Sequence, residues 1–164
     1  MYIILGLGIF VLLLVLTGRK SVHQEILVQA SPAEVWEVLL DTHKYPDWNP
    51  VMKVIEGEIK PGQRVKYLFI QPPGDPLEIE SVISQMLPNQ LLNQKGGSPF
   101  LLSFDHQYIL EGKETSQVLI HEEYRGLLVH FWNSASVEKA YARLLNALKK
   151  RTESLSSKAY ERNH

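Results

Sequence analysis

Hydrophobic residues are concentrated at the start of the chain. Fourteen of the first 18 positions are hydrophobic, and none of these 18 residues carries a charge. A helix over residues 1–18 has a length of about 27 Å, close to the ~30 Å hydrocarbon core of a bilayer. We therefore predict a transmembrane anchor at residues 1–18, with a secretory signal peptide and a buried helix of the soluble fold as the alternatives.

The flanks of this segment favour the anchor. A signal peptide has a positively charged start and a small-residue cleavage site, and neither is present in this sequence. The basic residues Arg19 and Lys20 follow the segment directly. The positive-inside rule then places the following domain in the cytoplasm, as part of a single-pass membrane protein.

Beyond residue 20, short alternating segments predict strands. Residues 21–30, 63–71, 77–86, 104–110 and 117–124 have the β-branched or alternating pattern that is typical of strands. Ser31 and Glu34 have the spacing of a capping box, followed by the helical pattern of Val35 and Trp36. Residues 41–52 contain two prolines and predict a short broken helix or loop. The Gly-Gly-Ser-Pro run at residues 96–99 is expected to break the segment that contains it.

The pattern changes to a helix at about residue 134. Over residues 134–155, Tyr141, Leu144, Leu145 and Leu148 share one face. Consecutive strands joined by hairpins predict an antiparallel sheet, and only this helix is long enough to cover its apolar face. The prediction is one α+β domain over residues 22–155, with residues 156–164 as a polar C-terminal tail.

Composition narrows the class of protein. The chain has 164 residues, no cysteine and a formal net charge of −1. The absence of cysteine excludes a disulfide scaffold, a cysteine nucleophile and a thiolate metal site. The near-neutral charge argues against a nucleic-acid-binding protein. Residues 137–164 nevertheless hold seven basic and three acidic residues, either as a solvated helix face or as a contact with anionic lipid.

Candidate chemistry is confined to a few residues. None of the six histidines has the spacing of a helical metal motif, and neither a P-loop nor a Gly-x-Ser-x-Gly elbow occurs. We therefore expect no metal and no cofactor. His106, His121 and Glu122 lie on neighbouring predicted strands, where they form either a metal or acid–base site or a hydrogen-bonded polar pair. The aromatic residues of the domain are either core or the lining of a cavity for an apolar ligand.

Five segments of the chain resemble, in order, the motifs of one protein family. They are residues 31–36 (SPAEVW), 45–50 (YPDWNP), 104–110 (FDHQYIL), 122–128 (EEYRGLL) and 146–153 (NALKKRTE). Together they are similar to the START-like helix-grip superfamily, also called SRPBCC. Within it, the sequence most resembles the polyketide cyclase/dehydrase-like branch, over about residues 22–155.

This resemblance implies a helix-grip fold, in which a curved antiparallel sheet wraps around the long C-terminal helix and a hydrophobic tunnel lies between them. It also implies binding of lipids, sterols, polyketides or other apolar molecules. The leading hypothesis is a membrane-anchored binder of a hydrophobic small molecule or lipid, with no assigned reaction. The residues expected to line the cavity or its mouth are Trp48, Tyr67, Phe69, Phe104, His106, Tyr108, Glu122 and Tyr124.

Two other hypotheses remain open. The first is a cyclase- or dehydratase-like enzyme in which His106 and Glu122 are an acid–base pair in a dry pocket. It requires that these side chains do not both point away from the cavity. The second is a non-catalytic interaction module, similar to the chaperone-activator members of the superfamily, which a filled interior would favour. Trp36 and Leu144 are expected to belong to the core.

Overall fold

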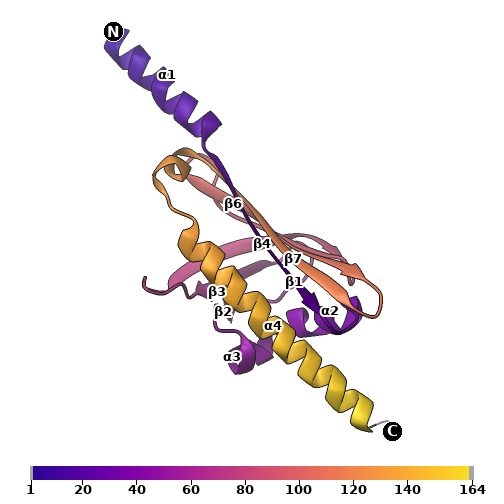
Figure 1. The fold of residues 1–164 in the computed structure, drawn as a ribbon. Coiled ribbons are helices and arrows are strands. Elements are labelled where there is room, and N and C mark those ends of the chain that lie inside the picture. Colours follow the sequence, from indigo (N-terminus) through magenta and orange to yellow (C-terminus); the bar gives the residue numbers. More distant parts are fainter. Residues whose placement is uncertain (1, 163–164) are drawn as a thin grey trace.

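Seven antiparallel strands form one sheet in the computed structural model, which describes residues 2–162. The strand order is β1-β7-β6-β5-β4-β3-β2, so hairpin connections build most of the sheet and β1 pairs with β7. The curved sheet has the long C-terminal helix α4 across one face (Figure 1), as the helix-grip resemblance implies. The strands are β1 (Arg19–Val28), β2 (Met52–Glu56), β3 (Arg64–Phe69), β4 (Leu77–Leu87), β5 (Leu91–Ser98), β6 (Leu102–Gly112) and β7 (Ser116–Arg125).

The helices follow the local signals in the sequence. The capping box predicted at Ser31 and Glu34 starts α2 (Pro32–Leu40) and is confirmed. The broken segment after it consists of η1 (Thr42–Lys44) and α3 (Tyr45–Trp48), and a further short turn, η2 (Leu127–Phe131), precedes α4 (Ala135–Arg162). Residues 156–162, which we assigned to a polar tail, continue α4, whereas residues 163–164 lie outside the described part of the chain.

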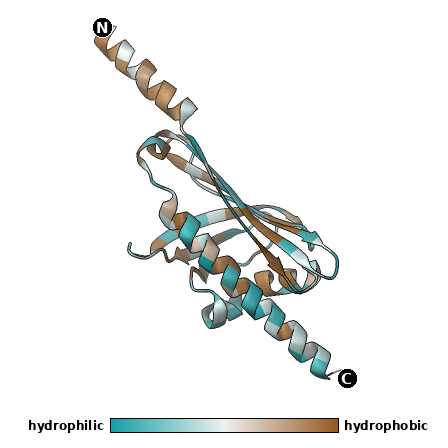
Figure 2. Ribbon diagram, in the orientation of Figure 1, coloured by the Kyte–Doolittle hydropathy of each residue, from teal (hydrophilic) through white to brown (hydrophobic). Residues whose placement is uncertain are grey.

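The core lies between the sheet and α4. Tyr141, Leu144, Leu145 and Leu148 are all buried on the face of α4 that meets the sheet, as predicted. Hydrophilic residues cover the exposed side of the helix (Figure 2). Trp36 of α2 is also buried, so α2 closes the core together with α4.

The first helix, α1 (Tyr2–Thr17), projects away from the domain (Figure 1) and is apolar along its length (Figure 2). None of its residues is buried. Its 16 residues give a helix of about 24 Å, and within residues 2–162 no helix combines the length and apolar character needed to span a membrane. The predicted transmembrane helix over residues 1–18 is therefore not supported.

A contact with a residue far along the chain sets the C-terminal boundary of α1. The buried Gly18 accepts a hydrogen bond through its carbonyl from the Gly126 N–H at 3.0 Å, so the chain leaves the helix to pair beside the end of β7. A Cβ atom at residue 18 would lie 2.0 Å from the Gly126 carbonyl oxygen. Only glycine permits this approach, and it ends the helix before the length predicted for residues 1–18 is reached.

The sequence patterns did not predict two of the seven strands, β2 and β5, and the expected break inside β5 was wrong. The first strand after α3, β2, was missed because residues 52–56 show no regular alternation of burial. β5 continues through residues 96–98, where we expected a break, and Gly96 and Gly97 pair with Phe104 and Ser103. The Glu80 backbone carbonyl of β4 and the aromatic ring of Phe104 occupy the space in which a side chain at residue 96 would lie. The strand therefore requires glycine here and does not end at it.

Candidate functional site

His106 and Glu122 lie directly opposite each other on β6 and β7. Because side chains alternate between the two faces of a strand, this register turns both residues toward α4. The two side chains are only 3% and 4% exposed, and His106 Nδ1 lies 3.6 Å from Glu122 Oε2. The structure thus brings the two candidate catalytic residues together inside the domain.

Two tyrosine hydroxyls donate hydrogen bonds to the Glu122 carboxylate. Tyr124 Oη donates to Glu122 Oε2 at 2.6 Å, and Tyr141 of α4 donates to the same oxygen. Burial, together with the negative charge of Glu122, raises the pKa of both tyrosines well above the usual range. Both phenols therefore stay protonated and remain hydrogen-bond donors to the carboxylate.

The His106 ring has no hydrogen-bond partner among the described residues. Both ring nitrogens are buried, and the ring lies edge-on to Tyr108 and Tyr141, with centroid distances of 4.8 and 5.3 Å. An unsatisfied buried polar group costs about 1–3 kcal/mol. His106 is consequently the group in this site that gains most from a polar atom of a bound molecule.

A second buried polar cluster lies beside the first. Gln94 Oε1 accepts hydrogen bonds from Tyr67 Oη at 2.7 Å and from Ser81 Oγ at 3.0 Å. These residues come from β5, β3 and β4, and they line a small void that also touches His106 and Glu122. Burial raises the pKa of Tyr67, so this phenol also remains a donor.

A larger apolar cavity adjoins the void and extends to the start of α4. Its volume is about 230 Å³. The Glu122 carboxylate and its two tyrosines form one wall, and hydrophobic side chains form most of the remainder. The lining comprises Phe69, Gln71, Leu77, Ile79, Gly97, Leu102, Phe104, Glu122, Tyr124, Trp132, Val137 and Tyr141. Such a mostly apolar space with a few convergent polar groups is typical of a small-molecule site.

The structure places most of the predicted ligand-binding residues at this site. Those that line the cavity or the void are Tyr67, Phe69, Phe104, His106, Glu122 and Tyr124. Tyr108 is buried beside His106 but lines neither space. Trp48 lies elsewhere, in a separate groove where α2 and α3 face α4. Its role as a cavity residue is therefore not supported by its position.

His121 does not join the other two residues of the cluster considered from the sequence. It faces the opposite side of the sheet, where its ring lies 5.9 Å from that of His23. The reason is the alternation along β7, which turns neighbouring residues His121 and Glu122 to opposite faces. Within residues 2–162, no group of three potential metal ligands is present.

Sequence reasoning missed several residues of the site. Tyr141 was assigned to the core face of the last helix, and Trp132, Leu102 and Val137 were not singled out. For Tyr141, a signal was available, because its hydroxyl is the polar group on an otherwise apolar helix face and requires a partner when buried. Its partner, Glu122, lies 19 residues away and depends on how α4 docks.

The family comparison agrees with this architecture. The family described as "Polyketide cyclase / dehydrase and lipid transport" matches residues 19–153. The chain therefore belongs to this family, and the SRPBCC-type resemblance drawn from the motifs is confirmed. A search of curated proteins finds no match.

Solved structures share the fold at low sequence identity. The Zhui aromatase/cyclase from Streptomyces sp. R1128 superposes with a TM-score of 0.68 at 20% identity, covering 82% of this chain and 94% of that one. A norcoclaurine synthase point mutant from Thalictrum flavum gives 0.62 at 16% identity, covering 84% and 96%. Ginseng major latex-like protein 151 from Panax ginseng gives 0.66 at 16% identity, covering 82% and 98%.

Proposed function

We propose that the protein binds an apolar small molecule or lipid in the cavity between the sheet and α4. The observation that carries this proposal is the arrangement of Glu122, Tyr124 and Tyr141 as the polar wall of an otherwise apolar cavity of about 230 Å³. Membership of a family described by lipid transport and by cyclase or dehydrase activity supports it.

The site favours a ligand with a polar group at the inner end of an apolar body. Phe69, Leu102 and Val137 offer only apolar contacts, whereas His106, which lines the adjoining void, has unpartnered ring nitrogens beside Glu122. A hydroxyl or carbonyl group at that end satisfies the imidazole. The apolar body gains from leaving water.

Native mass spectrometry tests the binding proposal on the full chain, released from lipid nanodiscs. We expect a co-purified apolar molecule, identified by organic extraction, and its displacement by the fluorescent apolar probe N-phenyl-1-naphthylamine. The matched control is a variant with a filled cavity, Leu102→Trp, which should retain neither molecule. If the unmodified protein carries no ligand and binds no probe, the proposal is wrong.

A second candidate function is acid–base catalysis of a cyclase or dehydratase type. The observation that favours it is the buried contact between His106 and Glu122, with 3.6 Å between Nδ1 and Oε2. In a dehydration, a base removes a proton next to a carbonyl and an acid protonates the departing hydroxyl, so water is lost and a double bond forms. Glu122 lines the cavity itself, and His106 lines the small void that adjoins it.

The catalytic candidate predicts turnover of a β-hydroxy ketone that fits the cavity. His106→Gln and Glu122→Gln should each abolish turnover while the probe still binds, because both changes keep the size of the side chain approximately. If the unmodified protein binds the probe but turns over no substrate, the binding function is supported and the catalytic function is not. The interaction-module alternative receives less support, because a partly open apolar cavity lies between the sheet and the start of α4.

We further propose that α1 attaches the protein to a membrane, with the domain on the cytoplasmic side. The support is an uncharged helix that has no buried residue and projects from the domain (Figure 1), followed by Arg19 and Lys20. Leaving this much apolar surface in water is unfavourable. Attachment to the bilayer holds the cavity near a reservoir of apolar molecules.

A further inference from the structure

The sheet is split between β4 and β5. Their pairing begins at Leu87 and Leu91 and ends at Ser81 and Gly96. Beyond this point, residues 77–80 of β4 pair only with β3, and residues 97–98 of β5 pair only with β6. We call this unpaired region the β4–β5 gap.

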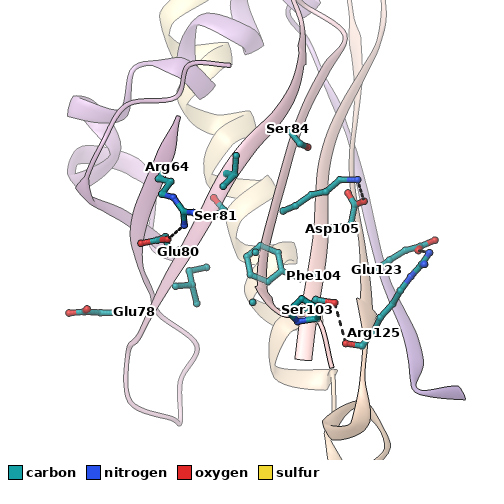
Figure 3. Close-up of a pocket in the computed structure, with 16 residues that line it drawn as sticks. Arg64, Glu78, Glu80, Ser81, Ser84, Ser103, Phe104, Asp105, Glu123 and Arg125 are labelled. Carbon is teal, nitrogen blue, oxygen red and sulfur yellow. Dashed lines mark hydrogen bonds and ion pairs between the residues drawn. The ribbon is translucent and has the colours of Figure 1, made fainter. Parts of the chain in front are cut away.

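A groove of about 1020 Å³ lies over the β4–β5 gap on the side of the sheet away from α4. Ile79 and Phe104 line this groove, the apolar cavity and the small void beside it. In Figure 3, the Phe104 ring lies between the β3–β4 side of the groove and the β6–β7 side. A few side chains at the gap therefore separate the outer groove from the interior.

The Phe104 side chain lies at the gap, where its movement would open a path from the groove to the cavity. It is only partly buried, and its ring lies over Gly96, where a Cβ atom would be 2.5 Å from the ring carbon Cζ. Because Gly96 has no side chain, the Phe104 ring has room to lie over it. A phenylalanine has no hydrogen bond to hold it, and partly exposed side chains change rotamer on fast timescales.

The size of the partly open apolar cavity indicates how a ligand occupies it. Pockets for drug-sized ligands have volumes of about 300–1,000 Å³, and the cavity, at about 230 Å³, is smaller. A drug-sized ligand therefore fits only partly inside the cavity as long as the Phe104 ring stays in this position. The remainder extends past Phe104 into the groove.

Three ion pairs include all the charged residues that line the groove except Glu78. Arg64 with Glu80, Lys95 with Asp105 and Arg125 with Glu123 form ion pairs at 2.5, 2.8 and 2.7 Å, and these residues line the groove. Paired charges offer hydrogen bonds without a strong net field. They suit an uncharged polar end better than an ionic one.

We propose that the β4–β5 gap is the entrance to the ligand cavity and that Phe104 gates it. The ligand is an elongated, mostly apolar molecule whose inner polar group lies at the His106–Glu122 end of the site and whose uncharged polar outer end remains in the groove. This inference rests on the proposed binding function. It adds the route of uptake and the character of the ligand's outer end.

Binding kinetics test the gate. The full chain in lipid nanodiscs is mixed with N-phenyl-1-naphthylamine in a stopped-flow instrument, and energy transfer from tryptophan reports the occupied cavity, which Trp132 lines. We expect Phe104→Ala to raise both the association and the dissociation rate by about tenfold, the effect of losing one aromatic contact. Phe100→Ala is the matched control, because Phe100 is 71% exposed and outside the groove.

A crosslink tests the gap without changing the cavity lining. The chain has no cysteine, so Glu78→Cys and Ser98→Cys on its two sides can be joined by a bismaleimide. We expect both rates to fall by about tenfold. The control crosslink joins Glu25→Cys and Gln117→Cys, whose native side chains hydrogen-bond across the intact β1–β7 pair, and it should leave the rates unchanged.

The outcomes separate the two proposals. The entrance proposal is wrong if the unmodified protein binds the probe normally and neither the gap crosslink nor Phe104→Ala changes the rates. The binding function then remains intact. Rates altered only by Trp48→Ala assign the entrance to the groove between α2, α3 and α4 and overturn the proposal as well. Absence of probe binding by the unmodified protein contradicts the binding function, and the entrance with it.

Discussion

Tyr141 on α4 donates a hydrogen bond to Glu122 on β7, across the interior of the domain. Tyr124 donates to the same carboxylate oxygen from β7 itself. One buried carboxylate thus joins the long helix to the sheet that curves around it. The contact stabilises the fold and also forms the polar wall of the cavity.

The first prediction concerns this contact. Tyr141→Phe keeps the ring and removes one donor from a buried carboxylate, and hydrogen bonds to charged groups contribute about 1.5–3 kcal/mol. We expect the free energy of unfolding, measured with urea, to fall by that amount. Tyr160→Phe, at an exposed position of the same helix, should have little effect. Equal stability of the two variants would contradict a structural role for the Tyr141–Glu122 bond.

The second prediction concerns the cavity. Leu102→Trp places a larger side chain into the space of about 230 Å³ that Leu102 lines. We expect the Kd of the apolar probe to rise by about tenfold or more, equivalent to 1.4 kcal/mol or more. Leu101→Trp is the control, since the neighbouring Leu101 is 50% exposed and does not line the cavity. An unchanged Kd in Leu102→Trp would place the ligand elsewhere.

The third prediction concerns alkaline stability. Burial raises the pKa of Tyr67, Tyr108, Tyr124 and Tyr141, whereas an unfolded tyrosine ionises near pH ~10. Above that pH the unfolded state binds fewer protons than the folded state, so the free energy of unfolding falls as the pH rises. Below that pH these tyrosines add no pH dependence.

Urea unfolding between about pH 8 and about pH 11 measures this effect. Each tyrosine that stays neutral contributes a slope of up to about −1.4 kcal/mol per pH unit. Tyr108→Phe should make the loss of stability above pH ~10 less steep. Tyr160→Phe, which removes an exposed phenol, should not. An identical slope in both variants would show that Tyr108 ionises in the folded protein.

The fourth prediction concerns α1. Ile9→Asp combined with Leu13→Asp introduces two charges on exposed positions of this helix, and an aspartate near the middle of a membrane-embedded helix costs about 2.5–3.5 kcal/mol. We expect co-sedimentation with phosphatidylcholine–phosphatidylglycerol vesicles to fall to background. The control, Leu87→Asp combined with Leu155→Asp, charges exposed leucines of the domain. Equal sedimentation of both proteins would refute attachment through α1.

Local signals predicted much of the site's framework. The capping box at Ser31 and Glu34 depends on four consecutive residues and was correct in detail. The alternation along β6 and β7 also turned His106 and Glu122 to the same face, as strand geometry requires. The failures occurred where a distant group decided the local structure. Gly96 is needed within β5 because the Glu80 carbonyl and the Phe104 ring leave no space for a side chain there, and α1 ends where Gly18 meets Gly126.

The sequence by itself determined the family and the antiparallel sheet with its covering helix, and it named His106 and Glu122 as candidate residues on neighbouring strands. These features follow from motif order and from side-chain periodicity, which operate within a few residues along the chain. Only the tertiary structure decided that Tyr141 reaches Glu122, that Trp48 lies outside the cavity, and that β4 and β5 separate beside Phe104. Each of these depends on how α4 and the strands dock, and docking joins residues far apart in sequence whose contacts no local pattern specifies.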